Sequence, residues 1–353
     1  MRVAMYYRNS DVRIEEMPRP EAGPGEILVR AAACGICGSD VLEWYRMKKA
    51  PLVLGHEMAG EVVEVGDGVG GGGGGGGGFS VGDRVFVSHH VACGKCRWCR
   101  SGHATACETL HTTNYDPGGF AEFVRVPQIN VERGTFRLPD ATSYDDATFI
   151  EPVACVLRGQ RALGVRAGDT VLVLGSGLAG LLHVVLSKLS GAGRVIATDV
   201  SASRLAKARE LGADVAIDAS GGSVVGRVQE ANGGELPERV VLCTGAAPAV
   251  AQALDAVDRG GVVLFFAVPT DDVAVPMNRY WRNDVTIRTS YAGDGRDIAE
   301  AIDAIAAGRI PTDAMITHRL PLGEVQRGFD LMSGSAEGQA GEGAVKVIIH
   351  PGE

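Results

Sequence analysis

Four of the eight cysteines in this chain stand at positions 93, 96, 99 and 107. Two-residue gaps allow neighbouring thiolates to turn back onto one metal ion, and the longer last gap allows the fourth thiolate to complete a tetrahedron. We therefore expect a structural zinc site in a lobe at about residues 90–110, held by Cys93, Cys96, Cys99 and Cys107. Two disulfides are the alternative, but the chain starts without a secretory signal pattern, which favours a reducing compartment and a metal.

The length and charge of the chain limit its architecture and its partners. A chain of 353 residues predicts two domains, because single cores stop growing at about 250 to 300 residues. The net charge of -9 and a pI near 5.5 argue against a surface for nucleic acid or anionic membrane. No apolar run reaches the ~18 to 20 residues that span a bilayer. We expect a cytoplasmic protein that acts on a small molecule, without nucleic acid or membrane as a partner.

The first part of the chain, up to about residue 139, has short β-branched runs that are interrupted by Gly, Pro and Asp. This pattern predicts a β-rich, barrel-like domain with long loops. Nine consecutive glycines occupy positions 70–78, between two expected strands at residues 60–66 and 79–87. Glycines offer no side chain to bury, so we expect them to lengthen a surface turn.

After residue 151 the pattern changes to apolar runs that alternate with helical segments such as residues 178–189 and 202–211. The six expected strands lie at residues 171–174, 194–199, 214–218, 239–243, 261–267 and 285–289. This alternation predicts a parallel, doubly wound sheet. The tail adds a helix at residues 297–307 and a strand at 344–349 that has no place in a six-stranded sheet. We therefore expect an α/β two-domain chain, with residues 1–153 as the first domain, 154–291 as the second, and 292–353 returning to the first.

A glycine-rich turn follows the first strand of the second domain. It contains the motif GxGxxG, formed here by Gly175, Gly177, Leu178, Ala179 and Gly180. In this context the glycines allow a tight turn, the approach of a pyrophosphate to the backbone, and close packing of helix on strand. Asp199 ends the next strand, where a carboxylate accepts hydrogen bonds from a ribose and repels a 2'-phosphate. NAD is therefore expected as the cofactor, with Arg204 leaving NADP as the alternative.

A second group of metal-binding residue types lies outside the cysteine lobe. Cys37 begins a Cys-Gly-Ser-Asp run, His56 and Glu57 follow Gly55, and Glu151 precedes a proline at the domain boundary. A thiolate, an imidazole and a carboxylate can bind zinc, and three protein ligands with one open position make a catalytic site. These residues suggest a catalytic metal in addition to the structural one.

Several motifs together resemble one family nearly from end to end: the zinc-dependent medium-chain alcohol dehydrogenase superfamily. They are the Cys-Gly-Ser-Asp run at 37–40, Gly-His-Glu-Met-Ala-Gly at 55–60, the cysteine lobe, the Glu-Pro pair at 151–152, the glycine turn and Thr-His-Arg-Leu-Pro-Leu at 317–322. The Glu151 position is similar to the sorbitol and polyol dehydrogenase branch. The resemblance implies a GroES-like β-rich catalytic domain and a Rossmann domain with a six-stranded parallel sheet.

The resemblance also implies roles for the residues of the second metal group. Cys37 and His56 would bind the catalytic zinc directly. Glu57 and Glu151 would share the remaining protein position, and the sequence leaves open which of them is the direct ligand. Asp40 would orient His56 and fix its tautomer.

The proton path departs from the family pattern. Ser39 would contact the substrate hydroxyl and begin the path, but Leu42 stands where many relatives carry a histidine that relays the proton. The resemblance places His89 in the substrate pocket, where its imidazole could bind a substrate hydroxyl or take over proton transfer. The alternative is that His89 only packs beside the zinc lobe.

The activity implied by the resemblance is hydride transfer from a secondary alcohol to NAD, giving a ketone, with two zinc ions per chain. A polyol, sugar alcohol or cyclitol is the expected substrate. An amino-alcohol or threonine-type dehydrogenase is the alternative, followed by a simple-alcohol dehydrogenase. A zinc module that binds nucleic acid is disfavoured by the acidic charge, and an inactive binding protein by the intact metal residues. Relatives imply a homo-oligomer, either a dimer or a tetramer.

Overall fold

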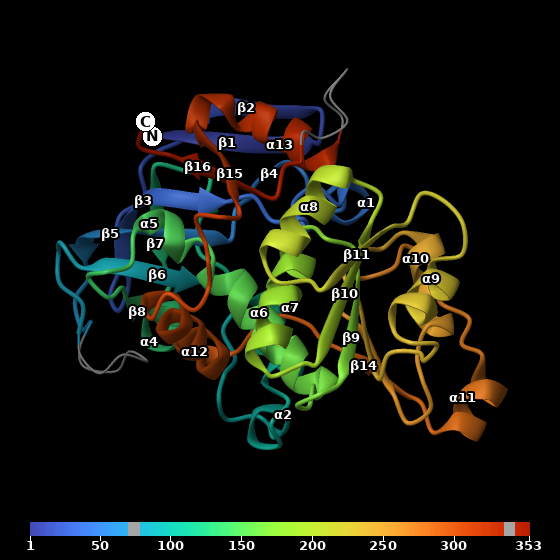
Figure 1. The fold of residues 1–353 in the computed structure, drawn as a ribbon. Coiled ribbons are helices and arrows are strands. Elements are labelled where there is room, and N and C mark those ends of the chain that lie inside the picture. The colour runs from blue at the N-terminus through green and yellow to red at the C-terminus, as the bar shows by residue number, and fades with distance from the viewer. Residues whose placement is uncertain (70–77, 335–342) are drawn as a thin grey trace. The chain divides into compact units, whose positions relative to one another are not determined.

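The computed structural model describes residues 1–69, 78–334 and 343–353 (Figure 1). The glycine turn expected at positions 70–78 therefore lies outside the described residues, except for Gly78. The chain divides into two compact units. The first contains Met1–Ala154 and Gly293–Glu353, and the second contains Cys155–Ala292.

The second unit is built on a parallel six-stranded sheet in the order β11-β10-β9-β12-β13-β14. The strands are β9 (Thr170–Leu174), β10 (Arg194–Asp199), β11 (Val215–Asp218), β12 (Arg239–Leu242), β13 (Val262–Phe265) and β14 (Thr286–Thr289). All five strand pairs are parallel, and the order is that of a dinucleotide-binding domain. This confirms the predicted doubly wound sheet, because strands such as β9 are buried along their whole length as in sheets covered on both faces.

Helices connect these strands. They are α7 (Leu178–Leu189), α8 (Ala202–Glu210), α9 (Val224–Ala231), α10 (Ala247–Asp255) and α11 (Met277–Asn283). Ser201 and Ser223 begin α8 and α9 by accepting a hydrogen bond from a backbone N–H of the first turn. An apolar core forms between α9, α10 and the sheet, with Leu172, Val228, Val240 and Val263 fully buried. Helix α6 (Ile150–Leu163) carries the chain from the first unit into the second.

The described part of the first unit forms two sheets. The smaller has the order β2-β1-β4, from β1 (Arg2–Arg8), β2 (Asp11–Glu16) and β4 (Leu52–Val53). The larger has the order β15-β16-β3-β5-β6-β8, and β7 also pairs with β3. Its strands are β3 (Ile27–Gly35), β5 (Glu57–Val65), β6 (Arg84–Ser88), β7 (Phe123–Val126), β8 (Thr135–Arg137), β15 (Ile316–Pro321) and β16 (Lys346–His350).

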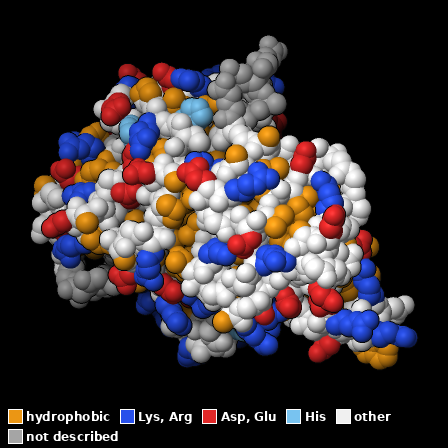
Figure 2. Space-filling view, in the orientation of Figure 1, with side chains coloured by type: hydrophobic (Ala, Val, Ile, Leu, Met, Phe, Trp, Pro, Cys, Tyr) orange, Lys and Arg blue, Asp and Glu red, His pale blue; other side chains and the backbone are white. Residues whose placement is uncertain are grey.

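Short helices fill the loops of this unit. They are α1 (Glu43–Arg46), α2 (Arg97–Arg100), η1 (Ala104–Ala106), α3 (Glu108–Thr112), α4 (Gln128–Gly134), α5 (Tyr144–Ala147), α12 (Gly295–Ala306), η2 (Leu322–Glu324) and α13 (Val325–Ser333). Within the described residues, no helix combines the length and the apolar character needed to cross a membrane. Acidic and basic side chains are interspersed over the face that Figure 2 shows.

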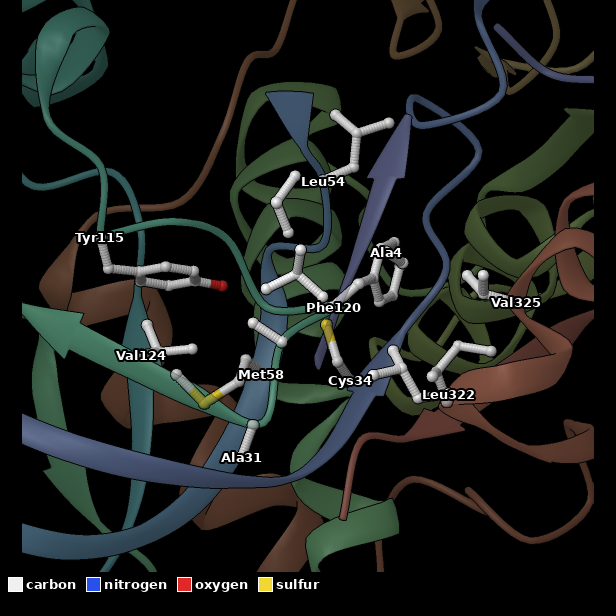
Figure 3. Packing of buried hydrophobic residues seen from close by; sticks show 14 of the residues in the cluster. Ala4, Ala31, Cys34, Leu54, Met58, Tyr115, Phe120, Val124, Leu322 and Val325 are labelled. Atoms are coloured by element: carbon white, nitrogen blue, oxygen red, sulfur yellow. The ribbon is translucent and has the colours of Figure 1, made fainter. Parts of the chain in front are cut away.

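Residues from both ends of the chain form the core of the first unit. Figure 3 shows Ala4, Cys34, Met58, Phe120 and Leu322 around one buried interior, and all five are at most 1% exposed. Strand β16 pairs with β3 in antiparallel orientation and with β15 in parallel orientation. The last strand of the chain therefore pairs with the end of β3, the strand that Cys37 follows.

One strand of the first unit is shorter than the sequence pattern suggests. A strand is expected at residues 79–87, but β6 starts only at Arg84. Gly82 has a φ of +93°, and Asp83 accepts a hydrogen bond from the backbone of Ser80, so these residues form a turn. The turn at Gly82 therefore prevents a strand before Arg84, although the alternation of apolar residues predicts one.

His183 in α7 is a buried, neutral histidine in the second unit. It is 0% exposed, and its Nδ1 accepts a hydrogen bond of 2.8 Å from Nε2 of Gln160. Its Nε2 has no partner among the described residues. Burial lowers the pKa of His183 to about 3. The folded chain therefore resists protonation at this site, whereas the unfolded chain takes up a proton near pH 6.5.

This site is expected to make the protein sensitive to acid. Stability from His183 is complete above pH 6.5 and is lost as the pH falls toward about 3. Replacing His183→Gln removes the titrating group. Between pH 6.5 and 5 we expect the free energy of unfolding of the variant to fall less steeply than that of the parent protein. The two slopes should differ by up to about 1.4 kcal/mol per pH unit. Urea unfolding at several pH values measures this.

His103→Gln is the matched control, because it makes the same exchange at an exposed position. Equal slopes for the His183 variant and the parent protein would contradict the assignment.

Candidate zinc and cofactor sites

Cys37, His56 and Glu57 form one candidate metal site. Cys37 follows β3, and His56 immediately precedes Glu57, the first residue of β5. The antiparallel register of β3 and β5 pairs Gly35 with Glu57, so the end of one strand meets the start of the other. One sulfur, one ring nitrogen and one carboxylate oxygen of the three residues all lie within 4.8 Å of one another. This donor set fits zinc, which binds thiolate, imidazole and carboxylate.

The Asp40 carboxylate is held from three sides. Its Oδ1 lies 3.3 Å from Nδ1 of His56 and accepts a hydrogen bond of 3.0 Å from Arg46, and its Oδ2 accepts one of 3.1 Å from the backbone N–H of Cys37. Burial opposes ionisation, but His56 and Arg46 hold the pKa of Asp40 below its usual value. Because Nδ1 of His56 faces Asp40, its Nε2 is left for a metal.

Glu57 is fully buried and forms an ion pair with Lys346 of β16, which is also fully buried. Lys346 Nζ donates to Oε2 of Glu57 and, at 2.9 Å, to the carbonyl of Thr148. The other oxygen, Oε1, is buried and has no partner among the described residues. A Cβ at Gly35 would lie 2.1 Å from Oε2 and 2.3 Å from Nζ. A glycine is therefore required where the ion pair crosses β3.

Glu151 is placed differently from Glu57. It lies in the first turn of α6, is half-buried, and is not among the residues that come within 4.8 Å of one another around Cys37. Burial, together with Cys34, Asp40 and Glu151, raises the pKa of Tyr115 well above its usual value. The charge of Glu151 thus acts on the same region.

His89 lies against His56. The ring centroids are 4.8 Å apart, and the ring of His90 lies tilted against that of His89 with a centroid distance of 3.9 Å. Nδ1 of His89 is buried and has no partner among the described residues. Burial, followed by the neighbouring His56, holds the pKa of His89 well below its usual value. The structure brings this histidine beside the candidate metal residues as a neutral imidazole, and its role in catalysis stays a prediction.

The four-cysteine lobe forms a second candidate metal site, with its sulfur atoms within 4.8 Å of one another. The sulfur of Cys99 lies 4.0 Å from that of Cys93 and 3.5 Å from that of Cys96. Four thiolates at the usual zinc–sulfur distance in a tetrahedron are about 3.8 Å apart. The backbone N–H of Cys96 donates to Cys93, and that of Cys93 donates to Cys107. Such hydrogen bonds favour thiolates.

The pKa of Cys107 supports this assignment. Burial alone would raise it, but hydrogen bonds from the backbone of Cys93 and Leu110 lower it to about 6. A thiolate is the form that binds zinc. The residues of the lobe therefore fit a structural zinc.

The glycine turn of the second unit has the geometry of a dinucleotide site. Gly175 has a φ of +92°, and a Cβ at Gly180 would lie 1.8 Å from the carbonyl oxygen of Gly175. A Cβ at Gly177, by contrast, would meet nothing within 4 Å. Gly177 begins α7, which continues through Leu178 and Ala179. Open space beside the backbone at the start of a long helix fits a pyrophosphate.

Asp199 stands at the end of β10, beside this turn. Its Oδ2 accepts a hydrogen bond of 2.7 Å from the backbone of Ser176, and its Oδ1 accepts one of 2.9 Å from Ser201. Both bonds fix the carboxylate, and each oxygen keeps a lone pair for a ribose hydroxyl. Arg204 lies in the first turn of α8, which begins after Ser201.

The fold and these residues define an oxidoreductase that binds zinc and NAD(P). Two families match the sequence: the one described as alcohol dehydrogenase GroES-like domain over residues 23–140, and the one described as zinc-binding dehydrogenase over residues 179–307. The chain is 32% identical to sorbitol dehydrogenase from Gallus gallus, over 97% of this chain and 94% of that protein. The chain belongs to the zinc-dependent medium-chain dehydrogenases, in the sorbitol dehydrogenase-like branch.

The chain is also similar to two further proteins. The chain is 30% identical to L-threonine 3-dehydrogenase from Rhizobium etli (strain CIAT 652), over 92% of this chain and 93% of that protein. It is also similar to a zinc-binding dehydrogenase from Sinorhizobium meliloti 1021 whose structure was solved with NADP bound. The TM-score is 0.84 and the identity 30%, over 99% of both chains.

Sequence reasoning missed two residues of the catalytic metal region, Lys346 and Arg46. Lys346 interrupts the apolar run of the last strand, and a lysine at an expected buried position is a signal that it has a partner. Arg46 lies seven positions beyond Ser39, and no sequence pattern indicates that it returns to contact Ser39 and Asp40. Both contacts depend on the path of the folded chain.

Removal of Lys346 should destabilise the first unit strongly. The variant Lys346→Met leaves the carboxylate of Glu57 buried without its partner, which costs about 3 to 5 kcal/mol. The double variant Glu57→Gln with Lys346→Met should recover part of this loss, since no buried charge remains unpaired. Urea unfolding measures all three proteins.

Lys188→Met is the matched control, because it removes a lysine whose ion pair with Asp214 is exposed. That change should cost at most about 1 kcal/mol. An equal effect of the two lysine variants would show that the buried pair contributes no more than a surface pair.

Proposed function

We propose that this protein oxidises a secondary alcohol of a polyol, sugar alcohol or cyclitol to a ketone, with NAD as the hydride acceptor. The observation that carries the proposal is the convergence of Cys37, His56 and Glu57, with Ser39 and Asp40 beside them, in a chain that also has a dinucleotide turn. In the reaction the carbon-bound hydrogen leaves as hydride to the nicotinamide, and the hydroxyl proton leaves to solvent.

Zinc, when bound, supplies a Lewis acid that lowers the pKa of a substrate hydroxyl. Cys37 and His56 would hold it, with Glu57 or Glu151 at the remaining protein position. Asp40 orients the ring of His56, and Ser39 offers its hydroxyl to the substrate oxygen. A second zinc, held by the four cysteines, would have no open position and would stabilise the lobe.

A hydroxyl-rich substrate is supported by the donors of the site and by its space. Carboxylates at the metal make the site harder than one built from thiolates alone. A Cβ at Gly38, next to Cys37, would meet nothing within 4 Å, so the chain leaves room beside this ligand. The similarity to sorbitol dehydrogenase supports the same class of substrate. The similarity to L-threonine 3-dehydrogenase favours an amino alcohol as the second candidate.

NAD is proposed over NADP because of Asp199. A fixed carboxylate at the end of β10 can accept hydrogen bonds from a ribose and repels a 2'-phosphate. Arg204 is the residue that would support NADP, the cofactor bound in the related Sinorhizobium meliloti structure.

A substrate panel tests the proposed reaction. We expect turnover of sugar alcohols or cyclitols with NAD, followed by nicotinamide absorbance, and kcat/KM at least about tenfold lower with NADP because of the carboxylate. Threonine and simple primary alcohols complete the panel. Preferential oxidation of threonine would establish the second candidate, and turnover of simple alcohols alone would exclude the polyol proposal.

The zinc ligands are tested by metal content. We expect two zinc ions per chain, and one after Cys96→Ser, which removes the closed site. Glu57 is already paired with Lys346, so Glu151→Gln should lose the catalytic zinc to a chelator more readily than Glu57→Gln, by about 10-fold or more. The reverse order would make Glu57 the direct ligand. Equal zinc retention by both variants would show that neither glutamate is an essential ligand.

A further inference from the structure

Arg46 is held against Ser39 and Asp40 by the short helix α1. The carbonyl of Leu42 accepts hydrogen bonds from the backbone of Tyr45 at 2.9 Å and of Arg46 at 3.0 Å. This single turn reverses the chain, so that the arginine side chain reaches back to the residues that follow Cys37. The side chain is 17% exposed, and its guanidinium also lies over the ring of Tyr45, 5.1 Å from the centroid.

The guanidinium makes three hydrogen bonds to these two residues. Nε donates to the carbonyl of Ser39 at 2.9 Å, and Nη2 donates to the hydroxyl oxygen of Ser39 at 2.9 Å and to Oδ1 of Asp40 at 3.0 Å. Asp40 is fully buried and also faces His56. Ser39 is therefore fixed through both its backbone and its side chain.

These contacts limit what the Ser39 hydroxyl can do. A hydroxyl has one donor and two acceptor sites. Arg46 occupies one acceptor site with an N–H donor. The proton of Ser39 must then point away from the arginine, and one acceptor site remains. Ser39 is left with one donor and one acceptor site for a substrate oxygen and for solvent.

We propose that Arg46 is the positioning residue of the proton path in this site: it fixes the Ser39 hydroxyl for the substrate oxygen and stabilises negative charge on it. This inference rests on the proposed function. The side chain of Leu42 carries no group that can pass a proton, and a guanidinium does not release one. Neither residue therefore carries the proton onward, and Arg46 acts through the Ser39 hydroxyl without transferring a proton itself.

A double-mutant cycle tests this role. The variants are Arg46→Met, Ser39→Ala and the two combined, measured on the substrate that the panel identifies. We expect Arg46→Met to lower kcat by about 10- to 100-fold, with KM changed less than about threefold. The combined variant should lose much less than the product of the two single losses, because the arginine acts mainly through that hydroxyl. Multiplied effects, or a raised KM with unchanged kcat, would overturn the proposal.

Two further variants separate geometry from charge and from folding. Arg46→Lys keeps the charge but lacks the planar fork, so it should restore only part of the lost kcat. Arg13→Met is the matched control, since Arg13 also pairs with an aspartate and lies over a tyrosine ring, far along the chain from the metal residues. It should leave kcat unchanged. Full recovery with lysine, or an equal loss in the Arg13 variant, would contradict the role.

A measurement without substrate keeps this test separate from the proposed activity. The guanidinium N–H signals of Arg46 in a nitrogen-15 spectrum can be assigned by their loss in Arg46→Lys. We expect the Nη2–H signal, which reports the hydrogen bond to the Ser39 hydroxyl, to shift in Ser39→Ala and to stay unchanged in the Arg13 variant. An unshifted signal would overturn the Arg46–Ser39 contact whether or not the protein oxidises polyols, whereas failure of the substrate panel alone would overturn only the proposed function.

Discussion

The buried ion pair between Glu57 and Lys346 is the constraint on which the first unit depends. The two residues are 289 positions apart in the sequence, and neither is exposed. Buried charges are tolerated only when they are paired and hydrogen-bonded. Strand β16 must therefore pair with β3 in the register that places the Lys346 side chain beside Gly35. In that register the lysine reaches Glu57, the first residue of β5. A slip of one residue would turn the lysine to the other face of the sheet.

Two ion pairs together determine the electrostatics around the candidate metal residues. On one side Lys346 faces Glu57, and on the other Arg46 faces Asp40, which in turn faces His56. The carboxylates of Glu57 and Asp40 are thus each held by a cation. The carboxylates can orient their neighbours without bringing uncompensated negative charge into a buried region. A divalent ion would then meet ligands whose positions do not depend on its presence.

The sequence was sufficient for the fold class because its signals are local. The glycine turn, the six apolar runs and the helices between them each follow from spacing within about thirty residues, and the observed strand order matches the predicted doubly wound sheet. The cysteine spacing is local in the same way. The contacts of Arg46 with Ser39 and Asp40, and of Lys346 with Glu57, could not be predicted, because each depends on a turn or a strand pairing that brings distant residues together.

This difference follows from the coordination that each candidate site requires. A site closed by four thiolates can be built by one short loop, because the metal itself holds the loop together. A catalytic site must keep one position open, so its ligands need support from outside the coordination shell. Cys37 and Glu57 come from different strand ends, and their positions are set by Gly35, Asp40 and Lys346. A catalytic site therefore depends on more of the chain than a structural metal site does, and the partners of Lys346 and Arg46 are identified only in the folded structure.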